Sequence, residues 1–178
     1  KKLTKMRKTA FKSIKTKKLK KKEILSICKL KNTQWKYGLK SQLKWFNKNI
    51  QNNDIHNLLY LEENLVGYNL LRKRKFFLKG KKKNYFYFDT IIVLKKYRKM
   101  KIGKLICEFS AKIIKKTKLH SMLICQNKLL KFYKKYEWQK IAKKNFKILD
   151  HEYPKDYSAM SFNQTKTISR NKLKYFMY

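Results

Sequence analysis

The stretch that decides the fold runs from Asp89 to Lys116 and reads DTIIVLKKYRKMKIGKLICEFSAKIIKK. Its start continues an aromatic and β-branched run without Gly or Pro, which predicts a buried strand from Tyr85 to Leu94. After a short basic loop, apolar residues recur from Ile102 at spacings of three and four, which predicts an amphipathic helix. A glycine at this turn, Gly103, lets the backbone approach a ligand closely.

The loop between this strand and helix has the chemistry of a phosphate-binding site. The first N–H groups of a helix have no partner within it, and they lie at the positive end of the helix dipole. The cations Arg98, Lys99, Lys101 and Lys104 surround them. These features suit a cofactor that carries a pyrophosphate. An ordinary strand–turn–helix unit with solvated lysines explains the same residues. The loop alone therefore does not decide between a phosphate-binding site and a purely structural turn.

A second motif follows at the expected distance. Ser121–Gln126 (SMLICQ) predicts another short buried strand, and Asn127–Tyr136 (NKLLKFYKKY) predicts a short helix before Glu137-Trp138. Together the two motifs resemble the GNAT superfamily of N-acetyltransferases. Arg98–Gly103 matches its loop pattern Arg/Gln-x-x-Gly-x-Gly/Ala, and Phe132–Trp138 matches its later Phe/Leu-Tyr and Gly-Phe.

The resemblance covers about Leu65 to Ile141 and has three departures. Lys101 replaces the first loop glycine, so we expect a turn made without a residue that readily adopts positive φ. Glu137 replaces the glycine of Gly-Phe. The asparagine that many members carry seven residues before the tyrosine is Gln126 here, with Asn127 one place late.

The resemblance implies an α+β fold with a mixed, mostly antiparallel central sheet flanked by helices, and one parallel pair where the two motif strands splay apart. At 178 residues one domain is the default, and we expect it to span 1–163, followed by a C-terminal tail at 164–178 with little patterning. The implied cofactor is acetyl-CoA. Its pantetheine would pair with backbone around Ile91 and Val93, and its pyrophosphate would lie on the loop. The predicted cofactor-binding residues are Ile91, Val93, Arg98, Lys99, Met100, Lys101, Ile102, Gly103, Lys104 and Asn127.

The resemblance also implies two catalytic residues. Tyr133 would protonate the leaving thiolate, because a phenol stays protonated at neutral pH; core packing on an apolar helix face is the alternative role. Direct transfer to an amine also needs a base, and Asp89 is the candidate. A carboxylate inside an apolar strand needs a task or a partner, so a buried salt bridge to a lysine is the rival interpretation.

The charge of the chain raises the question of nucleic acid. It has 49 Lys+Arg against 10 Asp+Glu, a formal net charge of +39, and basic charge neutralises phosphates. The lysines are spread along the whole length, however, and arginine, which is favoured for bidentate recognition, is scarce. This balance follows from an AT-rich coding sequence, and nucleic acid is not the favoured partner. A basic RNA- or ribosome-associated binding protein and a catalytically inactive CoA-binding GNAT-fold protein remain the alternatives to an enzyme.

The sequence indicates less directly which molecule accepts the acetyl group. The resemblance is, weakly, to the aminoglycoside 2′-N-acetyltransferase branch, which implies a primary amine of an amino sugar or an aminoglycoside-like molecule as substrate. Three acids close together, Asp150, Glu152 and Asp156, suggest a local pocket for a cationic amine, although the net charge would repel a polycation. No residues have the spacing of a metal site. The absence of a long apolar run and the odd number of cysteines favour a cytoplasmic protein without a membrane segment.

The remaining elements were predicted from periodicity and turn residues. Gly80 and Lys81–Lys83 are expected in a loop, and so is the region from the strand at Gln139–Ile141 through Pro154. Strands are expected at Phe11–Ile14, Ile55–Leu61, Leu65–Leu71 and Tyr157–Phe162, and helices at Lys22–Leu30 and Leu39–Ile50.

Overall fold

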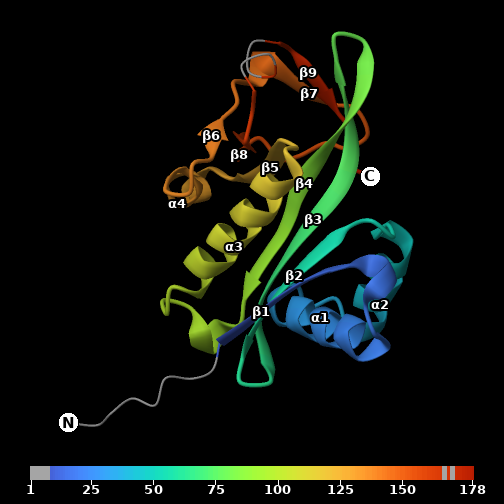
Figure 1. The fold of residues 1–178 in the computed structure, drawn as a ribbon, viewed down its shortest axis with the longest axis vertical. Coiled ribbons are helices and arrows are strands. Elements are labelled where there is room, and N and C mark those ends of the chain that lie inside the picture. Colours follow the sequence, from blue (N-terminus) through green and yellow to red (C-terminus); the bar gives the residue numbers. More distant parts are fainter. Residues whose placement is uncertain (1–8, 166–167, 169–170) are drawn as a thin grey trace, which may run out of the picture. The chain divides into compact units, whose positions relative to one another are not determined.

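The computed structural model describes residues 9–165, 168 and 171–178 (Figure 1). The chain divides into two compact units. The first unit consists of two segments, the described residues up to Leu70 and Thr90–Ile106. The second unit consists of Leu71–Asp89 and Cys107–Tyr178. In chain order the elements are β1 (Thr9–Lys15), α1 (Lys21–Gln34), α2 (Leu39–Asn49), β2 (Ile55–Leu61), β3 (Asn64–Leu78), β4 (Lys81–Val93), α3 (Ile102–Thr117), β5 (Ser121–Gln126), α4 (Leu130–Lys134), β6 (Gln139–Lys140), β7 (Phe146–Ile148), β8 (Tyr157–Phe162) and β9 (Leu173–Tyr175).

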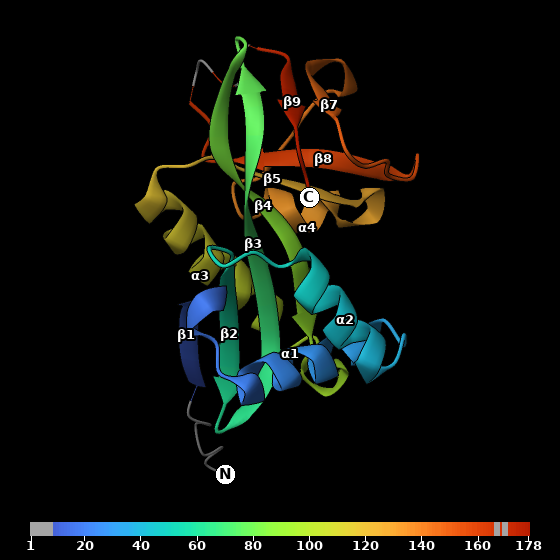
Figure 2. The same cartoon turned by 90° about the vertical axis from the view of Figure 1, so that its right-hand side faces the viewer.

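The strands hydrogen-bond in the order β1-β2-β3-β4-β5-β8-β6, and β9 pairs with both β3 and β7. β1 runs antiparallel to β2 with Thr9 opposite Leu61, and β5 runs antiparallel to β8, beside which it lies in Figure 2. β4 and β5 are parallel where Phe86 faces Ser121. The predicted α+β class, with a mostly antiparallel sheet and a parallel pair formed by the two motif strands, is confirmed. A second parallel pair, β7–β9, was not predicted.

In the first unit, α1 and α2 lie side by side (Figures 1 and 2) and bury apolar side chains with the strands. Ile27 of α1 and Phe46 of α2 share one core cluster with Leu58 and Tyr68. α1 begins at a cap in which the Glu23 carboxylate accepts the Lys20 N–H at 2.9 Å. The N–H groups of a first helical turn need such acceptors, which explains why the helix begins here.

The second unit buries a cluster of aromatic rings from its C-terminal segment. Tyr175 and Met177 belong to the same core cluster as Phe76 and Tyr85. The Tyr85 hydroxyl donates to the Phe176 carbonyl oxygen at 2.7 Å, and the Asp150 carboxylate accepts the N–H of Met177 at 2.9 Å. The final residues are therefore part of the core of this unit.

Two local predictions were wrong. Lys81–Lys83 are the first residues of β4, because the turn needs only Lys79 and Gly80, which both have positive φ (50° and 73°). The segment expected to be a loop through Pro154 contains β7. The segment 164–178, in which the sequence shows little patterning, contains β9; a strand of three residues is too short to show a period of two. The remaining predicted strands and helices are present.

Within the described residues, no helix is long and apolar enough to span a membrane.

Candidate functional site

The basic loop after β4 belongs to the first unit and connects directly to α3. Lys95–Tyr97 form one 3-10 turn, and the Tyr97 N–H donates to the Leu94 carbonyl at 2.8 Å. In the first turn of α3 the Leu105 N–H donates to the Lys101 carbonyl at 3.1 Å. The first N–H groups of a helix have no partner within the helix, so a helix start directly after a basic loop suits an anion.

Two lysines in this loop adopt the left-handed conformation. Lys99 has a φ of 68° and Lys101 a φ of 59°, while Met100 between them does not have positive φ. Lys101 thus takes the left-handed conformation itself, although it replaces a glycine of the family pattern and the sequence predicted a turn without such a residue. An alternation of left- and right-handed residues points successive N–H groups toward one side, which is the geometry of an anion-binding nest.

Arg98, the first residue of the loop motif, is held by two hydrogen bonds. Its Nε donates to the Val93 carbonyl at 3.2 Å, and its Nη2 donates to Oε1 of Gln34 at 2.5 Å. Gln34 is the last residue of α1. The guanidinium therefore links the loop to the end of β4 and to α1, and no local pattern predicts these contacts.

The predicted pantetheine strand lies between two apolar clusters. Ile91 and Val93 are half-buried against the cluster that contains Ile102 and Ile106 of α3. Gly67 of β3 lies where this helix packs closest, because a Cβ at this glycine would overlap the Ile106 side chain. Alternation along β4 thus leaves Ile91 and Val93 on the α3 side, where the loop begins.

Tyr133 belongs to the second unit and is 4% exposed. Its ring packs edge-on against Phe88 and Trp138, with centroids 6.1 and 6.2 Å apart. Burial, with the nearby Cys107 and Cys125 thiols, raises the pKa of Tyr133 well above its ordinary value. Within the described residues its hydroxyl has no hydrogen-bond partner. Tyr133 is therefore a protonated phenol whose proton is not committed to another group.

The two cysteines beside Tyr133 are also uncharged. Burial raises the pKa of Cys107 to about 12 and that of Cys125 to about 11. A thiolate is the nucleophilic form of cysteine. Neither thiol is therefore activated for covalent catalysis.

Asp89 forms an ion pair with Arg72 of β3, with 3.3 Å between Oδ2 and Nη1. The Arg72 side chain is 1% exposed and that of Asp89 is 20% exposed. The Tyr178 ring covers the guanidinium, with 4.6 Å between the ring centroid and Cζ. The rival interpretation of Asp89 was a salt bridge to a lysine, and the structure provides an arginine instead. Sequence reasoning missed Arg72, although an arginine inside an apolar strand also needs a partner.

Asn127 and Asp150 both bind neighbouring segments of the second unit. Oδ1 of Asn127 accepts the Ser158 hydroxyl at 2.6 Å, and its N–H donates to the Asp156 carbonyl at 2.9 Å. Asn127 therefore connects the end of β5 to the start of β8. The Asp150 carboxylate accepts backbone N–H groups of the C-terminal segment, including that of Tyr178 at 2.9 Å. Of the three acids proposed to attract an amine, Asp150 thus has a structural role.

The buried histidines are not placed for acid–base chemistry. His56 lies between Thr16 and Tyr68, 2.9 Å from Oγ1 and 2.8 Å from the phenol oxygen. His120 lies 3.1 Å from the Tyr175 hydroxyl. Burial lowers the pKa of both rings to about 3, so they are neutral at physiological pH. No group of three or more His, Cys, Asp or Glu side chains that could hold a metal ion occurs in the described part of the chain.

Several solved structures have a similar fold. ElaA from Escherichia coli is 12% identical with a TM-score of 0.65, over 86% of this chain and 99% of ElaA. Naa50 from Arabidopsis thaliana, solved in complex with the bisubstrate analogue CoA-Ac-MVNAL, is 21% identical with a TM-score of 0.59, over 86% of this chain and 97% of Naa50. The aminoglycoside N-acetyltransferase AAC(6')-Iy, solved in complex with CoA, is 11% identical with a TM-score of 0.57, over 76% of this chain and 88% of that chain.

No curated protein matches the sequence significantly. The model of the acetyltransferase (GNAT) family, in contrast, matches residues 24–138, which is more than half of the chain. This span contains both the basic loop before α3 and the tyrosine of α4. The predicted resemblance is confirmed, and the chain belongs to the GNAT acetyltransferase family.

Proposed function

We propose that this protein is an acetyl-CoA-dependent N-acetyltransferase. It moves an acetyl group by direct transfer to a primary amine of a small molecule, an amino sugar or an aminoglycoside-like compound. The observation that carries the proposal is Tyr133, a buried tyrosine at the position of the family motif whose protonated hydroxyl has no partner among the described residues. A group in this state can donate its proton at neutral pH.

The loop before α3 fits the pyrophosphate of acetyl-CoA, the acyl donor of the reaction. The left-handed Lys99 and Lys101 orient the amides, and the helix dipole adds positive potential at the same place. The backbone of Ile91 and Val93 would pair with pantetheine, and Asn127 would stabilise the end of β5. The phosphate-holding residues in this proposal are Arg98, Lys99, Met100, Lys101, Ile102, Gly103 and Lys104.

Tyr133 acts as the general acid. Its Oη donates the proton that the departing thiolate takes up, and solvent restores the proton afterwards. The neutral state of Cys107 and Cys125 supports this role, because a neighbouring thiolate would compete for the proton. Neither cysteine acts as a nucleophile, so the acetyl group passes directly from acetyl-CoA to the amine.

Asp89 is the base in this proposal. An ammonium group has no lone pair, so the acceptor must lose a proton before it attacks. The Asp89 carboxylate pairs with Arg72 and its side chain is 20% exposed, so an amine can approach it from solvent. Arg72 is a positioning residue in this proposal, because its buried guanidinium fixes the orientation of the carboxylate.

The experiment measures release of free CoA from acetyl-CoA across a panel of acceptors that includes glucosamine, kanamycin and a peptide with a free N-terminus. Tyr133→Phe should lower turnover at least about 100-fold, as expected for loss of a general acid, while affinity for acetyl-CoA is kept. Tyr136→Phe is the matched control, because it removes the same hydroxyl from a neighbouring tyrosine outside the proposed chemistry.

Each outcome bears on a separate part of the proposal. Acetylation of the peptide alone would overturn the small-molecule acceptor and leave the acetyltransferase intact. Binding of acetyl-CoA without turnover on any amine would favour a catalytically inactive protein. Full activity of the Tyr133→Phe variant would overturn the general-acid role.

A further inference from the structure

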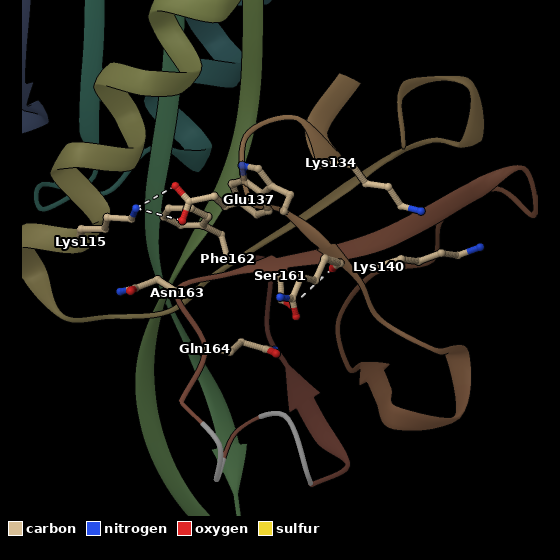
Figure 3. A pocket seen from close by; sticks show the side chains of 10 residues that line it. Lys115, Lys134, Glu137, Lys140, Ser161, Phe162, Asn163 and Gln164 are labelled. Atoms are coloured by element: carbon tan, nitrogen blue, oxygen red, sulfur yellow. Dashed lines mark hydrogen bonds and ion pairs between the residues drawn. The ribbon is translucent and has the colours of Figure 1, made fainter. Parts of the chain in front are cut away.

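The second unit contains a pocket of about 770 Å³ that no proposed catalytic or cofactor residue lines (Figure 3). Its walls come from the last turn of α3, from α4, from β6 and from the end of β8. This volume lies within the range of sites that bind small molecules, about 300 to 1,000 Å³. The question is therefore which ligand chemistry the walls fit.

The charged side chains leave the pocket positive. Lys115 pairs with both oxygens of Glu137 at 2.9 and 3.0 Å, so this cation and this acid neutralise each other. Lys134 and Lys140 also line the pocket, and in the part of the chain that the structure describes no acid lies within ion-pair distance of either. Figure 3 shows these two side chains, one from α4 and one from β6, extending in the same direction. Two ammonium groups that line the same pocket without a paired carboxylate favour an anionic ligand.

The rest of the lining consists of neutral polar groups and two buried aromatic rings. Gln139 and Gln164 contribute side-chain amides, which can donate to and accept from hydroxyl groups. Behind them the rings of Trp138 and Phe162 are buried and pack 5.4 Å apart. Uncharged hydrogen-bonding groups beside two cations suit a ligand with a charged end and a polyhydroxylated end.

The backbone at the rim is strained. Glu137 has a φ of 66° and Asn163 a φ of 58°, and the left-handed region is unfavourable for a residue as long as glutamate. Asn163 is held there by a 2.8 Å hydrogen bond from its side chain to the Leu119 carbonyl, and the exposed Glu137 side chain pairs with Lys115. Strained residues of this kind cluster at ligand sites.

We propose that this pocket binds a small phosphate monoester, with the phosphate at Lys134 and Lys140 and the hydroxylated remainder against the side-chain amides. The ligand class is that of sugar phosphates. The inference does not depend on the acetyltransferase chemistry, because it uses none of the residues assigned to that reaction.

Isothermal titration of the full chain with glucose 6-phosphate, inorganic phosphate and glucose tests the proposal at a fixed salt concentration. Glucose 6-phosphate should bind more tightly than inorganic phosphate, and glucose should bind most weakly. The variant Lys134→Gln/Lys140→Gln should lose at least about tenfold in affinity for glucose 6-phosphate, since each lysine supplies a charge-assisted hydrogen bond.

The control is Lys81→Gln/Lys83→Gln, which removes the same two charges from exposed positions at the start of β4. It should bind glucose 6-phosphate like the unmodified chain, because general attraction to a protein of net charge +39 is reduced equally in both variants. Thermal unfolding confirms that both variants are folded. Equal losses in the two variants, or equal affinities for glucose 6-phosphate and inorganic phosphate, would overturn the proposal.

Discussion

Acidification should destabilise this protein through its two buried histidines. Burial lowers the pKa of His56 and His120 from the ordinary 6.5 to about 3. Between these two pH values the unfolded chain binds a proton on each ring and the folded chain does not. Stability therefore falls as pH falls below 6.5, because the unfolded state binds more protons. From pH 7 to pH 5.5 each ring should reduce the free energy of unfolding by about 1.3 kcal/mol, and the two together by about 2.5 kcal/mol.

Urea denaturation followed by circular dichroism at the two pH values measures this change. Ionic strength must be held constant, because the self-repulsion of a chain of net charge +39 depends on salt. His56→Gln and His120→Gln lower stability at pH 7 as well, so the informative quantity is the difference between the two pH values. In each variant, the difference in unfolding free energy between pH 7 and pH 5.5 should be about half of that in the unmodified chain.

The exposed His151 provides the control. His151→Gln removes an exposed ring in place of a buried one, so it shows how much of the change comes from substituting any histidine. If His56→Gln and His120→Gln kept the full difference of the unmodified chain, the acid sensitivity would arise elsewhere, and the reasoning from burial would be wrong.

Three further substitutions test single features of the fold by urea denaturation. Glu137→Gly should raise the free energy of unfolding by up to about 1 kcal/mol, because glycine adopts a φ of 66° without strain. The Glu137 side chain is 70% exposed and gains little from its ion pair, so a clear loss of stability would contradict this. Asp89→Ala should lower it by about 3 kcal/mol, since it removes a carboxylate partner of the buried Arg72, and an unchanged value would show that the pair contributes nothing. Gly67→Ala should cost about 1 to 3 kcal/mol through overlap with Ile106, and Ile106→Val should recover part of that cost only if the overlap is its cause.

Local patterns were sufficient for much of the fold. Ile55–Leu61 is a strand with the bounds that its alternation and flanking turns predicted. The strand, basic loop and helix between Asp89 and Lys116 also follow the prediction, because burial of one helix stripe imposes a period that the residues themselves display. The resemblance that implies a role for Tyr133 also rests on two motifs, each of which is local in the chain.

Contacts between distant segments were decided only by the tertiary structure. Nothing near Asp89 in the chain indicates that its partner is Arg72, because the choice depends on which strand lies alongside β4. β9 has three residues and pairs with β3 and β7, which provide the hydrogen bonds that so short a segment cannot supply alone. The left-handed conformation of Lys101 likewise needs surrounding structure to hold it, since a lysine has no intrinsic preference for positive φ. The sequence by itself determined the helices and strands whose apolar residues repeat with a clear period. Charge partners, short strands and strained turns arise from neighbours far along the chain, because their interactions outweigh local propensity.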